Sequence, residues 1–178
     1  GLTSLSDAAA ESLSKRKAPL RIIPDNLPES AADILEKVLT KEIAEQFLAA
    51  NGAFDLCEFT SIEDDAVETL SKYEVELQLR GLTSLSDAAA ESLSKYRGDL
   101  YLGLPILSGA VAKSLGKHRG VLCLCTTSLS DTAVESISQH RGNTLDLPDL
   151  LSLSDFAAES LGEWHAGELT LDALTILS

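Results

Sequence analysis

The chain has 178 residues, enough for one domain with a sizeable core, and its 14 Lys and Arg against 28 Asp and Glu give a formal net charge of −14 at pH 7. This charge disfavours nucleic acid and anionic membrane surfaces as partners, because both attract clustered Lys and Arg. No run approaches the roughly 20 apolar residues that span a bilayer, and three cysteines without CxxC spacing predict neither a disulfide framework nor a zinc site.

A repeated element opens the chain. Residues 1–15 read GLTSLSDAAAESLSK, and residues 81–95 repeat that string letter for letter, which indicates a protein built from internal repeats. In each copy a serine able to cap a helix precedes alanines and leucines at four-residue steps, a pattern that predicts a helix with one apolar face. Weaker copies begin at Thr60, Leu104, Thr127 and Leu151.

The next predicted element is irregular. Between two strand-like segments, residues 20–22 and 54–56, the step is about half a unit longer than elsewhere, and both halves of residues 27–53 match the helical part of the repeat. We expect an irregular double-helix unit at 27–53, with Pro28 in the first turn of one helix and Thr40 capping the other. The irregularity is either a neutral trace of duplication or a kink that makes a partner site.

The second identical copy shows how one unit should fold. Ser86 is expected to cap the helix, and Asp87 places a negative charge where the helix dipole favours it. Gly98 follows the last turn, where a left-handed residue commonly ends a helix. Residues 100–102, Leu-Tyr-Leu, then alternate as a short half-buried strand. The same glycine position recurs at Gly120, Gly142 and Gly167.

Segments with alternating apolar residues recur about every 23 residues and predict strands. Strands joined in one direction through helices form a parallel sheet. Because a helix is wider than the strand spacing of about 4.8 Å, we expect an α/β solenoid with the sheet on the concave face and the helices on the convex face. It should form one repeat domain over residues 1–178, and a segment of a longer array, because neither end shows a capping repeat. The segments are 20–22, 54–56, 77–79, 100–102, 122–124, 145–147 and 169–171.

The unit LYLGLPILSGAVAKSLGKHRG at 100–120 and its relatives resemble leucine-rich repeats, in particular a divergent bacterial variant with a GLTSLSDAAAESL-like consensus. The resemblance covers nearly the whole chain. Leu82 and Leu104 stand roughly where the usual pattern has an asparagine, so the turn after the strand should differ. The resemblance implies a scaffold for protein binding, with no common ligand or chemistry.

Comparison between units argues against metal and catalytic sites. His118 and His140 fall at a helix-end position that holds Arg16, Tyr73 and Tyr96 in other units, and His165 joins them if one residue is inserted near Trp164. This predicts a half-exposed packing position, and two histidines would leave a zinc tetrahedron incomplete. Serines recur as caps and no GxSxG elbow is present. We therefore expect no cofactor and no enzyme site in this segment; an active domain outside it is a less favoured alternative.

Acidic residues also recur in columns on the predicted helices. The favoured interpretation is a solvated outer face that keeps the array soluble. A ridge for a basic partner or for calcium is the sharper alternative, although no DxDxDG-type loop is present. The columns are Asp7, Asp64, Asp87, Asp131 and Asp155, with Glu11, Glu68, Glu91, Glu135 and Glu159.

Strand residues that point away from the helices vary while the leucines repeat, as in a recognition surface. Tyr101 beside Arg80 most resembles an interface hot spot. We predict a noncatalytic scaffold that binds a protein partner; the alternative is a structural spacer or an element that self-associates end to end. The cysteines should be free thiols, since Cys57 and Cys125 are three strands apart. The candidate contact residues are Arg21, Asp55, Gln78, Arg80, Tyr101, Cys123, Cys125 and Asp146.

Overall fold

Helices and short strands alternate along the chain in the computed structural model, which describes residues 37–174 and 176–177. The described elements lie in one compact unit, Val38–Ser178. The helices of this part are short, at seven to nine residues each. They are α3 (Lys41–Ala49), α4 (Asp64–Leu70), α5 (Asp87–Ser94), α6 (Gly109–Leu115), α7 (Asp131–Ile137) and α8 (Asp155–Gly162).

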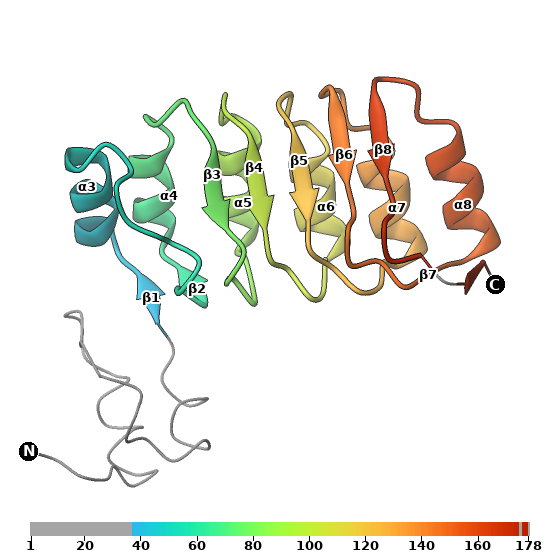
Figure 1. Ribbon diagram of the computed structural model, residues 1–178, viewed down its shortest axis with the longest axis horizontal. Coiled ribbons are helices and arrows are strands. Elements are labelled where there is room, and N and C mark those ends of the chain that lie inside the picture. The colour runs from blue at the N-terminus through green and yellow to red at the C-terminus, as the bar shows by residue number, and fades with distance from the viewer. Residues whose placement is uncertain (1–36, 175, 178) are drawn as a thin grey trace, which may run out of the picture. The chain divides into compact units, whose positions relative to one another are not determined.

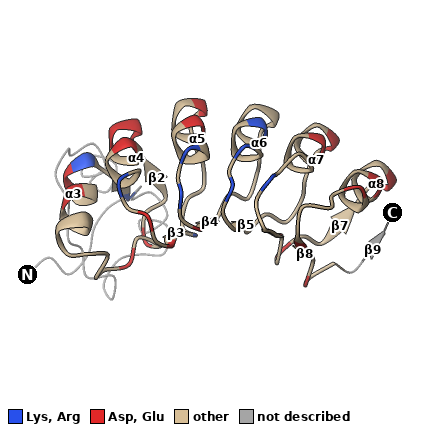
Figure 2. Cartoon of the chain, turned by 90° about the horizontal axis from the view of Figure 1, so that it is seen from above, with Lys and Arg blue, Asp and Glu red and all other residues tan. Residues whose placement is uncertain are grey.

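A five-stranded parallel sheet forms one layer of this unit. Its strand order, β3-β4-β5-β6-β8, follows the order of the strands in the chain, and a helix connects each strand to the next. The strands form one layer with the helices behind them (Figure 1), and the view from above separates the two layers (Figure 2). The strands are β3 (Leu77–Leu79), β4 (Leu100–Leu102), β5 (Leu122–Leu124), β6 (Thr144–Asp146) and β8 (Glu168–Thr170).

These strands confirm five of the seven predicted segments, two of them displaced by one residue. The prediction of a strand at 54–56 is wrong. There the backbone turns locally, with the Cys57 amide donating to the Asp55 side chain and the Phe59 amide donating to the Leu56 carbonyl. The predicted strand at 20–22 and the predicted first helix of the 27–53 unit lie outside the described residues. Helix α3 lies where the second helix of that unit was predicted.

Four further strands of two residues each were not predicted. They form two parallel pairs, β1 with β2 and β7 with β9. Three of them end directly before the N-cap residue of a helix, so they set the direction in which the chain enters that helix. They are β1 (Val38–Leu39), β2 (Ser61–Ile62), β7 (Ser152–Leu153) and β9 (Ile176–Leu177).

The core lies between the two layers and is built from strand leucines and small helix residues. Leu79 and Leu102 from the sheet are fully buried, as is the helix residue Ala90. Small side chains let the helices approach the sheet closely, and dense packing of aliphatic groups gives the layer its stability. Leu82 and Leu104, which follow β3 and β4, are also buried, so the turn after each of these two strands is filled by an apolar side chain.

Serine caps begin four of the helices as predicted. The Ser86 hydroxyl accepts a hydrogen bond from the Ala89 amide at 2.9 Å and also donates to Asp64 Oδ1 in the preceding unit at 2.5 Å. Ser108, Ser130 and Ser154 accept equivalent amide hydrogen bonds. Thr40 occupies the N-cap position of α3, but its side chain makes no capping hydrogen bond, so the prediction that Thr40 caps this helix holds for its position only.

Replacing Ser86 with alanine should lower the free energy of unfolding by about 1 kcal/mol, because it removes a helix cap together with the link to Asp64. Ser84→Ala, at an exposed position two residues earlier, is the matched control and should change stability little. Urea unfolding followed by circular dichroism measures both. Equal midpoints for the two variants would show that the cap contributes nothing.

The four glycines predicted to end helices, Gly98, Gly120, Gly142 and Gly167, do not take the left-handed conformation. Positive φ occurs in the described residues only at Asn51 and Gly52, and Lys95, the C-cap residue of α5, is right-handed. Gly98 is instead required by close approach, since a Cβ there would lie 1.7 Å from the carbonyl oxygen of Val75 in the preceding unit. Hypothetical Cβ atoms at Gly120, Gly142 and Gly167 would meet a carbonyl oxygen of the preceding unit in the same way.

Candidate functional site

A row of side chains crosses the face of the sheet that points away from the helices. Gln78, Tyr101, Cys123 and Asp146 are register partners on successive strands, and Thr170 follows Asp146 on β8. The leucines on either side of these residues point into the core, so alternation directs the row outward. We call this surface the open strand face, defined by Gln78, Arg80, Tyr101, Cys123, Cys125 and Asp146.

Arg80 and Tyr101 form the most ordered pair on the open strand face. The guanidinium carbon of Arg80 lies 5.0 Å from the centre of the Tyr101 ring, a distance that allows a cation–π interaction. Arg80 Nε donates to Gln78 Oε1 at 3.0 Å, and Gln78 Nε2 donates to Glu76. These contacts hold the guanidinium in place and leave its two terminal nitrogens without a partner among the described residues.

The three cysteines are free thiols, as predicted. Cys123 is fully buried within the row, and burial raises its pKa, with further contributions from Asp146. Burial also raises the pKa of Cys57 and of Cys125. Thiols with raised pKa values stay protonated at neutral pH and react poorly as nucleophiles.

Two of the predicted contact residues, Asp55 and Arg21, are not among the residues that define the open strand face. Asp55 is exposed in the turn that replaces the predicted strand, and its carboxylate accepts the Cys57 amide at 2.8 Å. That hydrogen bond holds the pKa of Asp55 below its usual value. Arg21 lies outside the described residues. Asp146 is only partly buried, but its Oδ1 atom is shielded and has no hydrogen-bond partner in the described part of the chain.

The histidine position at the helix ends is fully buried, which corrects the prediction of a half-exposed one. His118 is 0% and His140 is 2% exposed, and their rings stack with centroids 6.1 Å apart. Trp164 continues the stack 6.3 Å from His140 and donates from Nε1 to the His140 carbonyl at 2.7 Å. Trp164, not the exposed His165, therefore occupies this position in the last unit, because its large apolar ring fills the buried space.

The ring nitrogens of the two stacked histidines are buried, which is unusual for polar atoms that lack well-formed hydrogen bonds. Neither nitrogen of His118 or His140 makes a hydrogen bond of good geometry among the described residues, although nearby backbone groups, such as those of Val121 and Gly98 beside His118, favour the protonated ring in part. Burial lowers the pKa of both rings, that of His118 to about 4, so both are neutral at pH 7. The aromatic residues Tyr96 and Trp164 at the same position were the signal in the sequence that could have revealed its burial.

Within the described residues, no group of three or more His, Cys, Asp or Glu side chains is placed to hold a metal ion. None of the helices described is long and apolar enough to cross a membrane.

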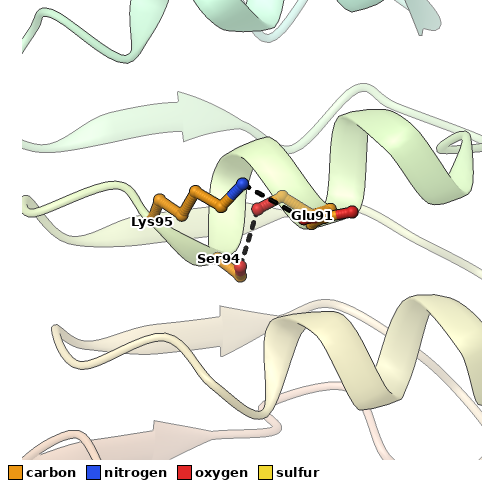
Figure 3. Close-up of polar contacts among 3 residues, drawn as sticks. All are labelled: Glu91, Ser94 and Lys95. Atoms are coloured by element: carbon orange, nitrogen blue, oxygen red, sulfur yellow. Dashed lines mark hydrogen bonds and ion pairs between the residues drawn. The ribbon is translucent and has the colours of Figure 1, made fainter.

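The outer helix layer carries exposed acidic side chains, and several helices show them on their outer turns (Figure 2). On α5, Lys95 Nζ lies 3.1 Å from Glu91 Oε1, and Ser94 donates to the Glu91 carbonyl at 2.6 Å (Figure 3). The hydrogen bond from Lys95 holds the pKa of Glu91 below its usual value. An exposed pair of this kind contributes little to stability.

Two grooves cut into this outer layer between neighbouring helices. The α3–α4 groove has a volume of about 390 Å³, and the α7–α8 groove is larger, at about 510 Å³. The α3–α4 groove is lined by Lys41, Glu45, Leu48, Asp65, Glu68, Thr69 and Lys72. The α7–α8 groove is lined by Glu135, Ser138, Gln139, His140, Arg141, Phe156, Ser160, Glu163, Trp164, His165 and Ala166.

The described residues thus offer surfaces for contact: a row of unlike side chains on the sheet, and grooves between the helices. The thiols are protonated at neutral pH. The two buried histidines are neutral, and no carboxylate or other side chain is hydrogen-bonded to their rings in the described part of the chain. No family model matches this chain, and searches of curated proteins and of solved structures likewise found no significant match.

Proposed function

We propose that this chain is a noncatalytic protein-binding scaffold and that the open strand face is its contact surface. The main support for this proposal is the row of side chains across the open strand face. Leucines repeat on the buried side of β3 and β4, while the outward positions hold the partly exposed Gln78 and Tyr101, and the partly exposed Asp146 follows on β6. A fixed framework that presents different side chains at each step can be matched by one partner and not by others.

The proposal includes a leucine-rich-repeat-like solenoid, with the sheet on its concave face. A sheet whose strand order follows the chain order, with every connecting helix in one layer, supports this architecture. Neighbouring helices need about 8–10 Å between their axes, whereas neighbouring strands lie about 4.8 Å apart. A stack of such units relieves the mismatch by curving around its strands, and a concave surface encloses more of a partner than a flat one.

Arg80 and Tyr101 are the proposed anchor of this surface. Arg and Tyr are among the residues that most often dominate the free energy of protein association. Burial and the neighbouring carboxylate of Glu76 raise the pKa of Tyr101, so its hydroxyl remains a hydrogen-bond donor at neutral pH. Since the Arg80 side chain is already held by Gln78 and stacked on Tyr101, little conformational entropy would be lost when a partner binds it.

A capture experiment with two double variants tests the proposal. Immobilised wild-type chain should retain a partner from a lysate of the source cells, and Tyr101→Ala with Arg80→Ala should weaken the affinity of that purified partner roughly 30-fold or more, as expected for loss of a hot spot. Glu91→Ala with Lys95→Ala removes an exposed ion pair from α5 and should leave the affinity unchanged. Isothermal titration calorimetry measures the affinities, and circular dichroism confirms that each variant is folded.

Equal affinity of the partner for wild type and for the Tyr101/Arg80 variant would reject the open strand face as the contact surface. A loss confined to the Glu91/Lys95 variant would move the contact to the helices.

A further inference from the structure

The α7–α8 groove has an aromatic lining that the α3–α4 groove lacks. Phe156, in the first turn of α8, is 45% exposed, and Trp164 beside the groove is 8% exposed. Position 156 is not part of the repeated framework, because the corresponding second residues of the other helices are small or polar. Those residues are Glu42, Asp65, Ala88, Ala110 and Thr132. Core packing therefore does not require a phenylalanine here.

Carboxylates flank this aromatic surface. Glu135 on α7 and Glu163 at the end of α8 are exposed and line the groove. In the part of the chain that the structure describes, neither forms an ion pair. Arg141 and His165 also line the groove, so it is not uniformly acidic, but the chain as a whole carries a net charge of −14. The negative electrostatic potential that this net charge produces favours the approach of a cation.

The α3–α4 groove makes the contrast clear. It carries Glu45, Asp65 and Glu68, but Lys41 and Lys72 of the same chain line it with them, and it contains no aromatic residue. The chain thus places two cations of its own among the carboxylates of the α3–α4 groove. The α7–α8 groove also contains a cation of the chain, Arg141, and differs in having the exposed ring of Phe156 beside its carboxylates. An aromatic face next to carboxylates is the combination that recognises a cationic side chain.

We propose that the α7–α8 groove binds a lysine or arginine side chain on an exposed segment of a protein partner. The cationic head would lie over the Phe156 ring, within reach of Glu135 and Glu163, and its aliphatic stem would cover the apolar lining. This site is in the helix layer and is independent of the open strand face. It adds a contact that prefers a cationic group, whereas the anchor at Arg80 prefers an anionic one.

The only tryptophan of the chain reports on this groove directly. We would titrate the protein with an acetylated tetralysine peptide, follow the fluorescence of Trp164, and confirm the affinity from the polarisation of a dye-labelled copy of the peptide. We expect saturable binding at low ionic strength, and at least fivefold weaker binding for Phe156→Ala and for Glu135→Gln with Glu163→Gln. A tetraglutamate peptide should not bind.

The matched control is Glu68→Gln with Glu91→Gln, which removes the same number of exposed carboxylates from other helices. Its affinity for tetralysine should stay within about twofold of the wild type, because the groove is intact. If both double variants weaken binding equally, the attraction comes from the net charge and the proposal is wrong. Absence of saturable binding to the wild type, or full affinity in Phe156→Ala, would also overturn it.

Discussion

Replacing Gly98 with alanine should lower the free energy of unfolding by roughly 2–4 kcal/mol, the range of severe overpacking. The added Cβ would lie 1.7 Å from the Val75 carbonyl oxygen and 2.9 Å from Cε1 of Tyr96. The first contact is with backbone, which cannot rotate away. The two adjacent units must therefore separate, and separation also weakens the hydrogen bond that the Tyr96 hydroxyl donates to the same carbonyl at 2.9 Å.

Gly162→Ala provides the control for Gly98→Ala. No atom lies within 4 Å of a Cβ at Gly162, the last residue of α8, and alanine favours a helix over glycine by up to about 1 kcal/mol. This variant should be as stable as the wild type or slightly more stable in urea unfolding followed by circular dichroism. If Gly98→Ala unfolds at the same urea concentration as Gly162→Ala, close approach between units does not explain the repeated glycines.

Much of the fold follows from periodicity alone. The segments at 77–79, 100–102 and 122–124 form strands as predicted, because two leucines on one side of a strand can be buried only against a second layer. Ser86 caps its helix because a serine before an apolar repeat satisfies a free backbone amide in any such helix. Local patterns of this kind depend on neighbouring residues in the chain, so one sequence is enough to recognise them.

Features that depend on the distance between units could not be predicted in this way. Gly98 has the sequence context of a helix-ending residue, and only the position of Val75 in the preceding unit shows why a side chain is excluded there. His118 sits beside polar residues in the chain, yet stacking on His140 buries it. The α7–α8 groove arises from the spacing of two helices and from Phe156, a residue outside the repeat. The residues of the open strand face, by contrast, were predicted from strand alternation, and only the full burial of Cys123 depends on its neighbours in space.

Lowering the pH from 7 to 5 should destabilise the protein through its buried histidines. Burial is the main cause of the lowered pKa of His118, and the adjacent His140 adds to it; the backbone of Val121, the carboxylate of Asp99 and the backbone of Gly98 oppose the shift only in part. A histidine in the unfolded chain takes up a proton near its ordinary pKa of 6.5, whereas His118 in the folded protein does so only near pH 4. The unfolded state therefore binds more protons between these values, and stability falls as the pH falls through this window.

At pH 5 the free energy of unfolding should be lower by about 2 kcal/mol because of His118 alone. Each pH unit below the pKa of the unfolded histidine lowers it by about 1.4 kcal/mol. His118→Tyr should remove most of it, since Tyr96 fills the same position in another unit with its hydroxyl bonded to a backbone carbonyl. His165→Gln replaces an exposed histidine and should keep the wild-type profile. Urea midpoints are measured between pH 7 and pH 5, and the difference between each variant and the wild type separates the contribution of the histidine from that of the carboxylates. If the stability of His118→Tyr falls with pH as steeply as that of the wild type, protonation of His118 does not disrupt the stack. Contact between adjacent units would then not depend on neutral rings.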